Sequence, residues 1–360
     1  MKILIINPGS TTTKIAVFEN KDLVFEHKID HAQDSDFQEK FSKPGNILDQ
    51  LKHRAKDIEE ILKEKNITQL DTVVGRGGMI PPVVSGTYQI NEKMIDDLTN
   101  HPLANHASNL GAPLAKKIAK DFGIEDKAFI VDPVTTDEIE AKHKITGIPE
   151  IKRYAGWHAL NQKAVCREYA ASIGKKYENL NLIVAHIGGG ASFGARKKGK
   201  TINVTNALAG EGPMSPERSG QIPAQGLVEL CFSGKHTKDE ILYKILGGGG
   251  LFALLGTKDL KDLEIKYPSL DKDKKDVVDE MLAGFSRYIC SLIPDFEGEQ
   301  IDQILLTGGV VRWPLVVESI KKDLAALNIG ITVYPGEFEL EALRDGAIRV
   351  LSGKETAKEY

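Results

Sequence analysis

Residues 182–208 read LIVAHIGGGASFGARKKGKTINVTNAL, and this stretch decides the fold. An apolar run enters a turn of three glycines followed by Ala and Ser. An alternating run comes next, and a basic turn then leads into a third run. Short apolar or alternating runs bounded by glycine are typical of strands. The stretch is therefore predicted to be a three-stranded meander whose first turn is rich in glycine.

The same pattern opens the chain. Residues 3–14 read ILIINPGSTTTK, so an apolar strand enters an Asn-Pro-Gly turn. TTTKIAVF then alternates, and KDLVFEHKID (21–30) supplies a third strand. The match between the two meanders is architectural rather than letter for letter. A repeat of this kind predicts two similar α/β halves, each headed by a meander around a glycine turn.

The rest of the chain supplies the helices and strands that complete each half. Helical spacing of apolar residues predicts helices at 46–66, 108–122, 273–293 and 314–327. Buried strands are predicted at LDTVVGRGGMI, KAFIVDPV, DQILLTGGVV and ITVYP. We place the domain boundary near Ile148 and Pro149 and expect the last helix to return to the first half. The predicted domains are therefore 1–148 with 337–360, and 149–336.

Composition excludes several classes of protein. The 360 residues are 41% apolar and 27% charged, which is ordinary for a globular protein of two domains. A net charge of −4 gives no electrostatic reason to expect a nucleic acid or an anionic membrane as partner. The three cysteines form no CxxC pair, and no apolar run is long enough for a signal peptide or a membrane span. We therefore expect a cytoplasmic protein without disulfides or a zinc site.

Glycine turns follow apolar strands at 7–13, 186–192 and 307–310. Glycine lets backbone N–H groups approach a phosphate closely, although a single such turn is more often only a tight turn. Two equivalent turns that head two similar halves favour a clamp for one polyphosphate. The P-loop spacing is absent. Lys14 follows the first turn as a point charge for phosphate, its alternative role being that of a solvated strand residue.

Charged side chains near these turns are candidates for catalysis. Arg76 in VVGRGGMIPP and Arg218 in GEGPMSPERSGQIP lie in Gly- and Pro-rich loops, where a guanidinium can grip a carboxylate or phosphate. Asp132 directly follows a strand, where ligands gather in α/β folds. Glu339 and Glu341 are candidate Mg²⁺ ligands, or else acids that stabilise a helix N-terminus.

The histidines are less decisive. His106 precedes a predicted helix, His158 lies in RYAGWHALNQ, and His186 begins the second glycine turn. A lone histidine is more often structural. HExxH and the nucleophile elbow are both absent from the sequence, which argues against metalloprotease and hydrolase chemistry.

Five segments together resemble a known family. They are VTNALAGEGPMSPERSGQIP, HPLANHASNLGAPLA, FIVDPVTTDE, INPGSTTTK and HIGGGASFG. The chain resembles the acetate kinase family of the actin-like ATPase superfamily, and within it the butyrate kinases, over essentially its whole length. The resemblance implies an α/β fold of two ribonuclease-H-like domains. Each domain has a mixed five-stranded sheet flanked by helices, and ATP lies in the cleft between them.

The resemblance also implies an activity. Members of the family transfer the γ-phosphoryl group of ATP to a short-chain carboxylate, here butyrate or a related straight or branched acid. The products are an acyl phosphate and ADP, and the reaction is reversible. Mg²⁺ and a homo-oligomer, a dimer or larger, are implied as well. The alternatives are an acetate, propionate or sugar kinase of the same superfamily and a non-catalytic nucleotide-switched module.

Site residues follow from the family's motifs and from the glycine turns. Nucleotide contacts are expected from Ser10, Thr11, Thr12, Lys14, His186, Gly188, Gly189, Gly190, Gly308 and Gly309. Metal contacts are expected from Asn7 and Glu339 or Glu341, and catalytic roles from Arg218, His158, Asp132, Arg76 and His106. Two positions depart from the family pattern, because Gly189 stands where an Asn is usual and Arg76 where a His is usual.

Overall fold

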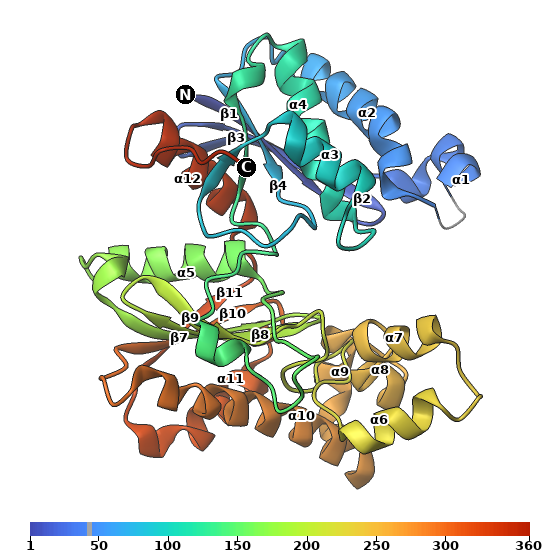
Figure 1. The fold of residues 1–360 in the computed structure, drawn as a ribbon, viewed down its shortest axis with the longest axis vertical. Coiled ribbons are helices and arrows are strands. Elements are labelled where there is room, and N and C mark those ends of the chain that lie inside the picture. Colours follow the sequence, from blue (N-terminus) through green and yellow to red (C-terminus); the bar gives the residue numbers. More distant parts are fainter. Residues whose placement is uncertain (42–44) are drawn as a thin grey trace. The chain divides into compact units, whose positions relative to one another are not determined.

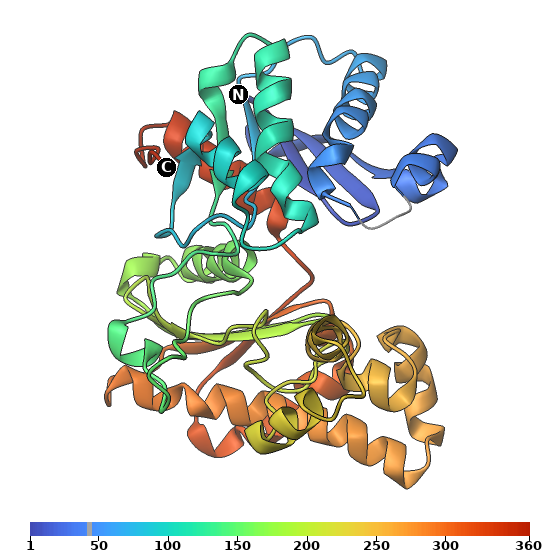
Figure 2. The same cartoon turned by 45° about the vertical axis from the view of Figure 1, so that its right-hand side comes forward.

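The computed structural model describes residues 1–41 and 45–360. The chain divides into two compact units, Met1–Asp137 with Phe338–Tyr360 and Glu138–Glu337. Figures 1 and 2 show the helices and strands of each unit. The predicted domain boundary at 148/149 and the predicted cleft between the domains stay predictions.

The first unit is built on one mixed sheet of six strands in the order β3-β2-β1-β4-β6-β5. β1, β2 and β3 form the predicted antiparallel meander, β4 and β6 continue the sheet parallel to β1, and β5 is an antiparallel edge strand. The strands are β1 Lys2–Pro8, β2 Thr12–Glu19, β3 Asp22–Asp30, β4 Thr72–Arg76, β5 Thr87–Gln89 and β6 Ala128–Val131. The helices are α1 Ser35–Phe41, α2 Leu51–Glu64, α3 Glu92–Asn100, α4 Gly111–Asp121 and α12 Glu339–Leu351.

The second unit has a five-stranded sheet in the order β11-β10-β7-β8-β9. Its strands are β7 Asn181–Ile187, β8 Ala191–Lys197, β9 Lys200–Val204, β10 Gln303–Gly308 and β11 Ile331–Pro335. Its helices are α5 Ala159–Ser172, α6 Ala224–Cys231, α7 Lys238–Leu246, α8 Gly250–Leu255, α9 Leu260–Lys266, α10 Lys272–Ser291 and α11 Pro314–Asp323. β7, β8 and β9 are antiparallel, and β10 and β11 are parallel to β7.

The two sheets share one topology. β9-β8-β7-β10-β11 in the second unit repeats β3-β2-β1-β4-β6 in the first, strand for strand. The predicted repeat of two α/β halves is therefore confirmed. The prediction of five strands in each sheet is right for the second unit and one strand short for the first. β5 is only three residues long, too short to show a period, and Lys358 bonds both ends of it through its backbone.

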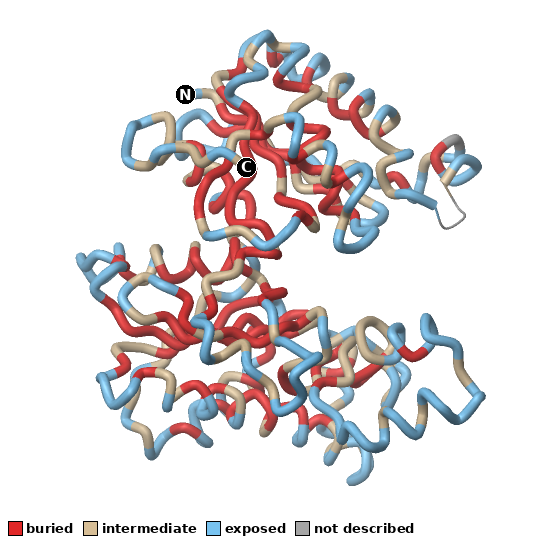
Figure 3. Tube along the Cα trace, viewed as in Figure 1, coloured by how far each residue is buried: buried red, intermediate tan, exposed pale blue. Residues whose placement is uncertain are grey.

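Alternating side chains on β1 face different layers of the first unit. Leu4 and Ile6 belong to the core formed with α2 and α4. Ile3 and Ile5 are equally buried and point to the other face, because successive strand residues alternate. α12 contacts β1, β4 and β6 and covers that other face (Figure 1). Both faces of the central strands are thus buried, as Figure 3 shows along the trace.

The second unit is layered in the same way. All seven residues of β7 are buried. Ile183, Ala185 and Ile187 belong to a core that includes side chains of α10 and α11, while α5 packs on β7 and β10. Figure 1 shows α5 on one face of this sheet and α10 and α11 on the other. Burial on both faces explains why β7 reads as an unbroken apolar run before His186.

The cysteines Cys166, Cys231 and Cys290 are free, in agreement with the expectation of no disulfide. Among the helices within residues 1–41 and 45–360, none is both long and apolar enough to cross a membrane.

Candidate active site

The first glycine turn joins β1 to β2 as a hairpin, with Asn7 paired to Lys14 and Pro8 to Thr13. A buried arginine of α2, Arg54, holds this turn from the inside. Its guanidinium donates to the backbone oxygens of Gly9, Ser10 and Thr12 at 2.8–2.9 Å. Because the carbonyl groups are drawn inward, Ser10 and Thr11 lie exposed at the tip of the turn.

Arg54 was not among the residues predicted from sequence. It is fully buried, and burial lowers the pKa of its guanidinium to about 10 against the opposing charge of Asp57. One signal was present, because position 54 falls on the apolar stripe of α2 between Leu51 and Ile58. An arginine in such a stripe must find several acceptors, and here the turn provides them.

Further support for the turn comes from His31. Its Nε2 lies 2.8 Å from the Thr13 hydroxyl, and its Nδ1 lies 3.1 Å from the Asp57 carboxylate. Lys14 is placed differently from these buried groups. Its side chain is 45% exposed, and Nζ lies 3.7 Å from Glu26 on the neighbouring strand. The predicted phosphate role of Lys14 stays a prediction.

Three predicted residues lie at or just after the ends of neighbouring parallel strands of the first sheet. Ile6 pairs with Gly75 and Arg76 with Val131, so Asn7, Arg76 and Asp132 lie in adjacent positions where β1, β4 and β6 end. Carboxyl ends of parallel strands are where open α/β sheets bind ligands. The register of the sheet therefore accounts for this gathering.

Asn7 and Arg76 meet Glu339, which enters from the first turn of α12. The guanidinium of Arg76 reaches both carboxylate oxygens of Glu339, at 2.8 and 2.9 Å. The Asn7 amide donates to the same carboxylate at 2.7 Å and accepts from Arg76 at 3.2 Å. Gly75, next to Arg76, is required by the close approach of α4, since a β-carbon there would lie 2.1 Å from the Gly111 carbonyl oxygen.

Glu341 stands apart from this cluster. It is exposed, and two residues along a helix turn a side chain by about 200° from Glu339. In the described residues no group of three or more His, Cys, Asp or Glu could hold a metal. One carboxylate and one amide oxygen nevertheless suit Mg²⁺, which takes one or two carboxylates together with water and substrate phosphates. Asn7 and Glu339 are therefore chemically fit to contact that ion.

Asp132 adopts an uncommon backbone conformation, with φ at +39°, and is buried. Its Oδ1 accepts from the Ser85 hydroxyl and the Gly86 amide. Positive φ at a non-glycine residue persists only where the surroundings impose it, and such residues cluster at functional sites. His106 has a local role, because its Nδ1 accepts from the Ser108 amide and caps the short helix at 107–110.

The second glycine turn, Gly188–Gly190, joins β7 to β8 as the counterpart of the first. A loop carrying Glu217 and Arg218 packs against it, and the Glu217 amide donates to the Gly189 oxygen at 3.0 Å. A β-carbon at Gly189 would lie 3.2 Å from the Glu217 carboxylate, and one at Gly190 would lie 3.0 Å from Arg218 Nε. Glycine at position 189, the departure from the family pattern, thus fits this loop.

Arg218 is half-buried beside the turn. Its Nη1 donates to the Leu246 carbonyl, while its Nε has no hydrogen-bond partner among the described residues. Burial lowers the pKa of the guanidinium, and the Glu217 carboxylate opposes that shift. A buried donor without an acceptor is rare in proteins. The role of Arg218 in binding a ligand stays a prediction.

His158 and His186 stack face to face, with ring centroids 3.7 Å apart and an interplanar angle of 6°. His158 Nδ1 lies 2.8 Å from the hydroxyl of Ser192, the serine of the glycine turn. His186 Nδ1 lies 2.8 Å from the Asn161 amide nitrogen. The structure therefore brings His158, His186 and the second turn together.

The third glycine turn lies next to the second. β10 runs parallel to β7 with Thr307 beside His186, and Gly308 follows with φ at +98°. A β-carbon on Gly308 would lie 2.2 Å from the Ile187 oxygen. At Gly309, by contrast, a β-carbon would meet no protein atom within 4 Å. Packing in the described residues does not explain this glycine, and a ligand close to the backbone would.

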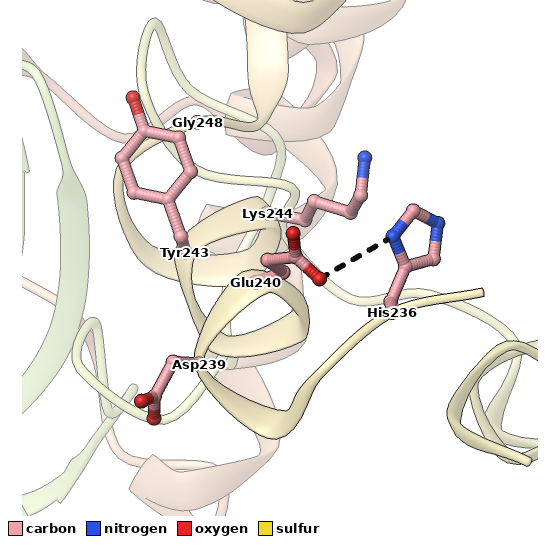
Figure 4. A pocket seen from close by; sticks show the side chains of 6 residues that line it. All are labelled: His236, Asp239, Glu240, Tyr243, Lys244 and Gly248. Carbon is pink, nitrogen blue, oxygen red and sulfur yellow. Dashed lines mark ion pairs between the residues drawn. The ribbon is translucent and has the colours of Figure 1, made fainter. Parts of the chain in front are cut away.

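An open pocket on α7 holds none of the predicted site residues. His236, Asp239, Glu240, Tyr243, Lys244 and Gly248 line it (Figure 4). The pair between His236 and Glu240 spans 4.0 Å at the surface, and Glu240 already caps its helix with Thr237. Helix capping and this surface pair account for Glu240 and His236.

The chain belongs to the Acetokinase family, whose model matches residues 2–342. The class of kinase to which it belongs is defined by two units that repeat the same sheet.

Individual relatives indicate which branch of the family the chain is similar to. The chain is 46% identical to a probable butyrate kinase of Clostridium botulinum, over 100% of this chain and 99% of that protein. It is 47% identical to butyrate kinase 2 of Clostridium acetobutylicum over the same shares. Among solved structures, acetate kinase of Porphyromonas gingivalis superposes with a TM-score of 0.78 at 18% identity, covering 97% of this chain and 99% of that one. The structural likeness supports the fold, and the sequence relatives give the branch of the family.

Proposed function

We propose that this protein is a carboxylate kinase that transfers the γ-phosphoryl group of ATP to butyrate or a closely related short or branched acid. The products are an acyl phosphate and ADP, and the reaction runs in both directions. The observation that carries the proposal is the full-length identity of 46–47% to proteins named butyrate kinase. Acetate, propionate and sugars are the competing acceptors.

The acceptor needs no general base. A carboxylic acid is ionised at neutral pH, because its pKa is about 4 to 5 like that of Glu. The difficulty is that one anion must approach another. Catalysis therefore rests on neutralising charge and holding the reacting groups in line. The absence of an obligatory base separates this reaction from sugar phosphorylation, in which a hydroxyl must lose its proton.

Residues of the second unit supply donors for the phosphates. Gly189 and Gly190 are assigned as backbone N–H donors, with His186 at the start of their turn, whereas the Gly188 N–H already donates to the Gly190 oxygen at 2.9 Å. Arg218 supplies a positive charge, and its buried Nε has no hydrogen-bond partner among the described residues. His158 adds a ring beside the same turn. Gly308 and Gly309 are assigned to the adenosine side, because the open space at Gly309 admits a ligand.

Residues of the first unit are assigned to the metal, the acceptor and the remaining phosphate contacts. Ser10, Thr11, Thr12 and Lys14 lie at or after the turn that Arg54 holds open. Asn7 and Glu339 would contact Mg²⁺, which when bound supplies positive charge to the nucleotide phosphates. Arg76 would orient the acceptor carboxylate, since its fork already fits that of Glu339. Asp132 stays a candidate for positioning and His106 for supporting the loop before α4.

Assembly and location complete the proposal. We infer a homo-oligomer, a dimer or larger, in the cytoplasm. The general rule that soluble oligomers are symmetric supports a closed assembly of identical chains. Size-exclusion chromatography with light scattering tests this part separately from the reaction.

A hydroxamate assay tests the activity directly. Purified protein is given ATP, Mg²⁺ and one acid at a time, from two to six carbons and including branched acids, and the acyl phosphate is trapped with hydroxylamine. We expect butyrate or isobutyrate to give the highest kcat/KM. Acyl hydroxamate from none of these acids would exclude the proposal. A maximum at acetate would move the assignment to the acetate kinase branch.

A further inference from the structure

A chain of hydrogen bonds in the second unit ends on the ring of His158. Arg196 Nη2 donates to Gln162 Oε1 at 2.6 Å. Gln162 Nε2 donates to the Ser192 hydroxyl oxygen at 2.7 Å, and that oxygen lies 2.8 Å from His158 Nδ1. Arg196, Gln162 and Ser192 are each 0% exposed. Solvent therefore cannot replace any member of the chain.

Arg196 determines which group donates and which accepts in each hydrogen bond that follows. A guanidinium only donates, so the Gln162 oxygen must face Arg196 and its NH₂ group must face Ser192. Three nitrogen atoms lie within hydrogen-bonding distance of the Ser192 hydroxyl: Gln162 Nε2, the His158 backbone nitrogen and His158 Nδ1. The first two are donors. Only Nδ1 can accept the hydroxyl proton.

We propose that Arg196, Gln162 and Ser192 are positioning residues that hold His158 as the neutral tautomer with its proton on Nε2. The opposite tautomer would leave the buried Ser192 proton without an acceptor among these three atoms. The proposal rests on the proposed function in one respect. There the Nε2 proton acts as a fixed hydrogen-bond donor to an anionic phosphoryl oxygen.

The surroundings of Arg196 fit this role. Its guanidinium lies 4.2 Å from the centre of the Trp157 ring, directly before His158 in sequence. Gly194 leaves room for the pair, since a β-carbon there would lie 3.1 Å from Arg196 Nη2 and 3.2 Å from Gln162 Oε1. The charge of Arg196 helps to lower the pKa of the Glu138 carboxyl, so an anion lies near the cation. Nη2 is the one guanidinium nitrogen of Arg196 for which a hydrogen bond is found, because Nε and Nη1 have no hydrogen-bond partner among the described residues.

The ring of His186, which stacks on that of His158, also has its acceptor nitrogen at Nδ1. Thr307 donates its hydroxyl proton to the Gly336 oxygen at 3.1 Å, so its own oxygen accepts from the Asn161 NH₂ group. That NH₂ group also lies 2.8 Å from His186 Nδ1, which must then accept. Two parallel rings, each with an acceptor at Nδ1, stack without the repulsion that two imidazolium charges would bring. This second network gives His186 the same tautomer as the one proposed for His158.

The test reverses the direction of the chain with one isosteric substitution. In Gln162→Glu the carboxylate still accepts from Arg196, but it now also accepts the Ser192 proton. Ser192 must then accept from His158 Nδ1, so the ring proton should move to Nδ1. Two-bond proton–nitrogen NMR spectra of ¹⁵N-histidine-labelled, full-length protein distinguish the two tautomers. A His158→Gln spectrum identifies which signals belong to His158.

We expect the Nε2 proton in the wild type and in Gln300→Glu, which adds the same charge at an exposed glutamine. We expect the Nδ1 proton in Gln162→Glu. Its kcat should fall on the order of 10²-fold with little change in the KM for ATP, as when one fixed donor is lost at the transition state. Ser192→Ala, should the first variant fail to fold, should give a mixture of tautomers.

The outcomes separate this inference from the proposed function. A wild-type proton on Nδ1, or a proton that stays on Nε2 in Gln162→Glu, would overturn the assignment. Failure of the wild type to make any acyl phosphate would instead remove the proposed function, while the tautomer would still be read from the spectra.

Discussion

Arg76 and Glu339 form a two-pronged ion pair although 263 residues separate them in the chain. One lies at the end of β4 and the other at the start of α12. The pair ties the sheet of the first unit to its last helix, at the point where the proposed metal and acceptor residues gather.

Glu339→Gln tests that pair. The change keeps the shape but removes the charge that Arg76 faces, and hydrogen bonds to charged groups contribute about 1.5–3 kcal/mol. We expect the free energy of unfolding in urea to fall by about 1–2 kcal/mol, because Arg76 is one-third exposed and water replaces part of the loss. The Mg²⁺ concentration for half-maximal activity should rise.

Glu341→Gln is the matched control for that substitution. It lies in the same helix turn and is exposed. Its unfolding free energy should stay within about 0.5 kcal/mol of the wild type. Equal effects at both positions would contradict the assignment of Glu339 over Glu341.

Arg54→Met tests the support of the first glycine turn. The variant removes the guanidinium donor from three backbone oxygens, although the Thr12 oxygen still accepts from the Gly9 amide and Ser10 is exposed. Each buried polar group left unpaired costs about 1–3 kcal/mol, so we expect a loss of about 1–3 kcal/mol in unfolding free energy. Arg54→Lys should recover part of the stability, because one ammonium cannot replace a fork. An unchanged KM for ATP in a folded Arg54→Met protein would contradict a phosphate site at the turn. Lys56→Met, on the exposed side of α2, serves as the control.

Arg218→Ala tests the proposed transition-state charge. Loss of an arginine that stabilises a transferring phosphoryl group lowers turnover on the order of 10³-fold. The circular dichroism spectrum and melting temperature should stay close to those of the wild type. Arg287→Ala, at an exposed arginine of α10, controls for loss of a surface charge. Near-normal turnover in Arg218→Ala would show that this arginine lies outside the chemistry.

Glu138 predicts a pH dependence of stability. Burial alone raises the pKa of its carboxyl, but Lys163, Arg196 and Thr201 together lower it below the usual value of 4.5. A folded pKa below the unfolded value means that the stabilisation is full above pH about 4.5 and is lost as the pH falls through the folded value. Urea unfolding between pH 6 and 3 should therefore be less pH-dependent in Glu138→Gln. Glu150→Gln, at an exposed loop position, should keep the wild-type slope.

Thiol labelling tests the packing of the second unit. Cys166 is buried, and burial raises the pKa of its thiol, whereas Cys231 and Cys290 are exposed. Only the thiolate reacts, so two thiols should react in the native protein and the third only after unfolding. Ellman's reagent with and without guanidinium measures this, and Cys166→Ala should remove the slow thiol. Rapid reaction of all three in native conditions would contradict the burial of α5.

Strand ends and glycine turns could be predicted because their signals are local. The apolar run before His186 and the alternation after Thr12 each fix a strand within a few residues. The two meanders then reveal the repeat. The gathering of Asn7, Arg76 and Asp132 follows from the order of parallel strands, and the resemblance pointed to the same positions.

Other features depend on contacts between distant segments. In the sequence, Arg54 looks like an ordinary polar helix residue. Its role is visible only in the folded structure, where the backbone oxygens of the turn surround it. β5 lies between β6, with which it pairs, and Lys358, which bonds its backbone. The difference between Glu339 and Glu341 depends on the rotation of α12 against β4. Each of these three features depends on tertiary packing, which a local stretch of sequence does not reveal.

The return of residues 338–360 to the first unit orders events during synthesis. β5 forms backbone hydrogen bonds with Lys358, and Asn7 and Arg76 form hydrogen bonds with Glu339. Both Lys358 and Glu339 are synthesised after the second unit. The second unit, residues 138–337, is a single continuous segment and leaves the ribosome complete before those partners emerge. The half that is translated first is therefore the half that is finished last, because residues 338–360 are synthesised only after the whole second unit.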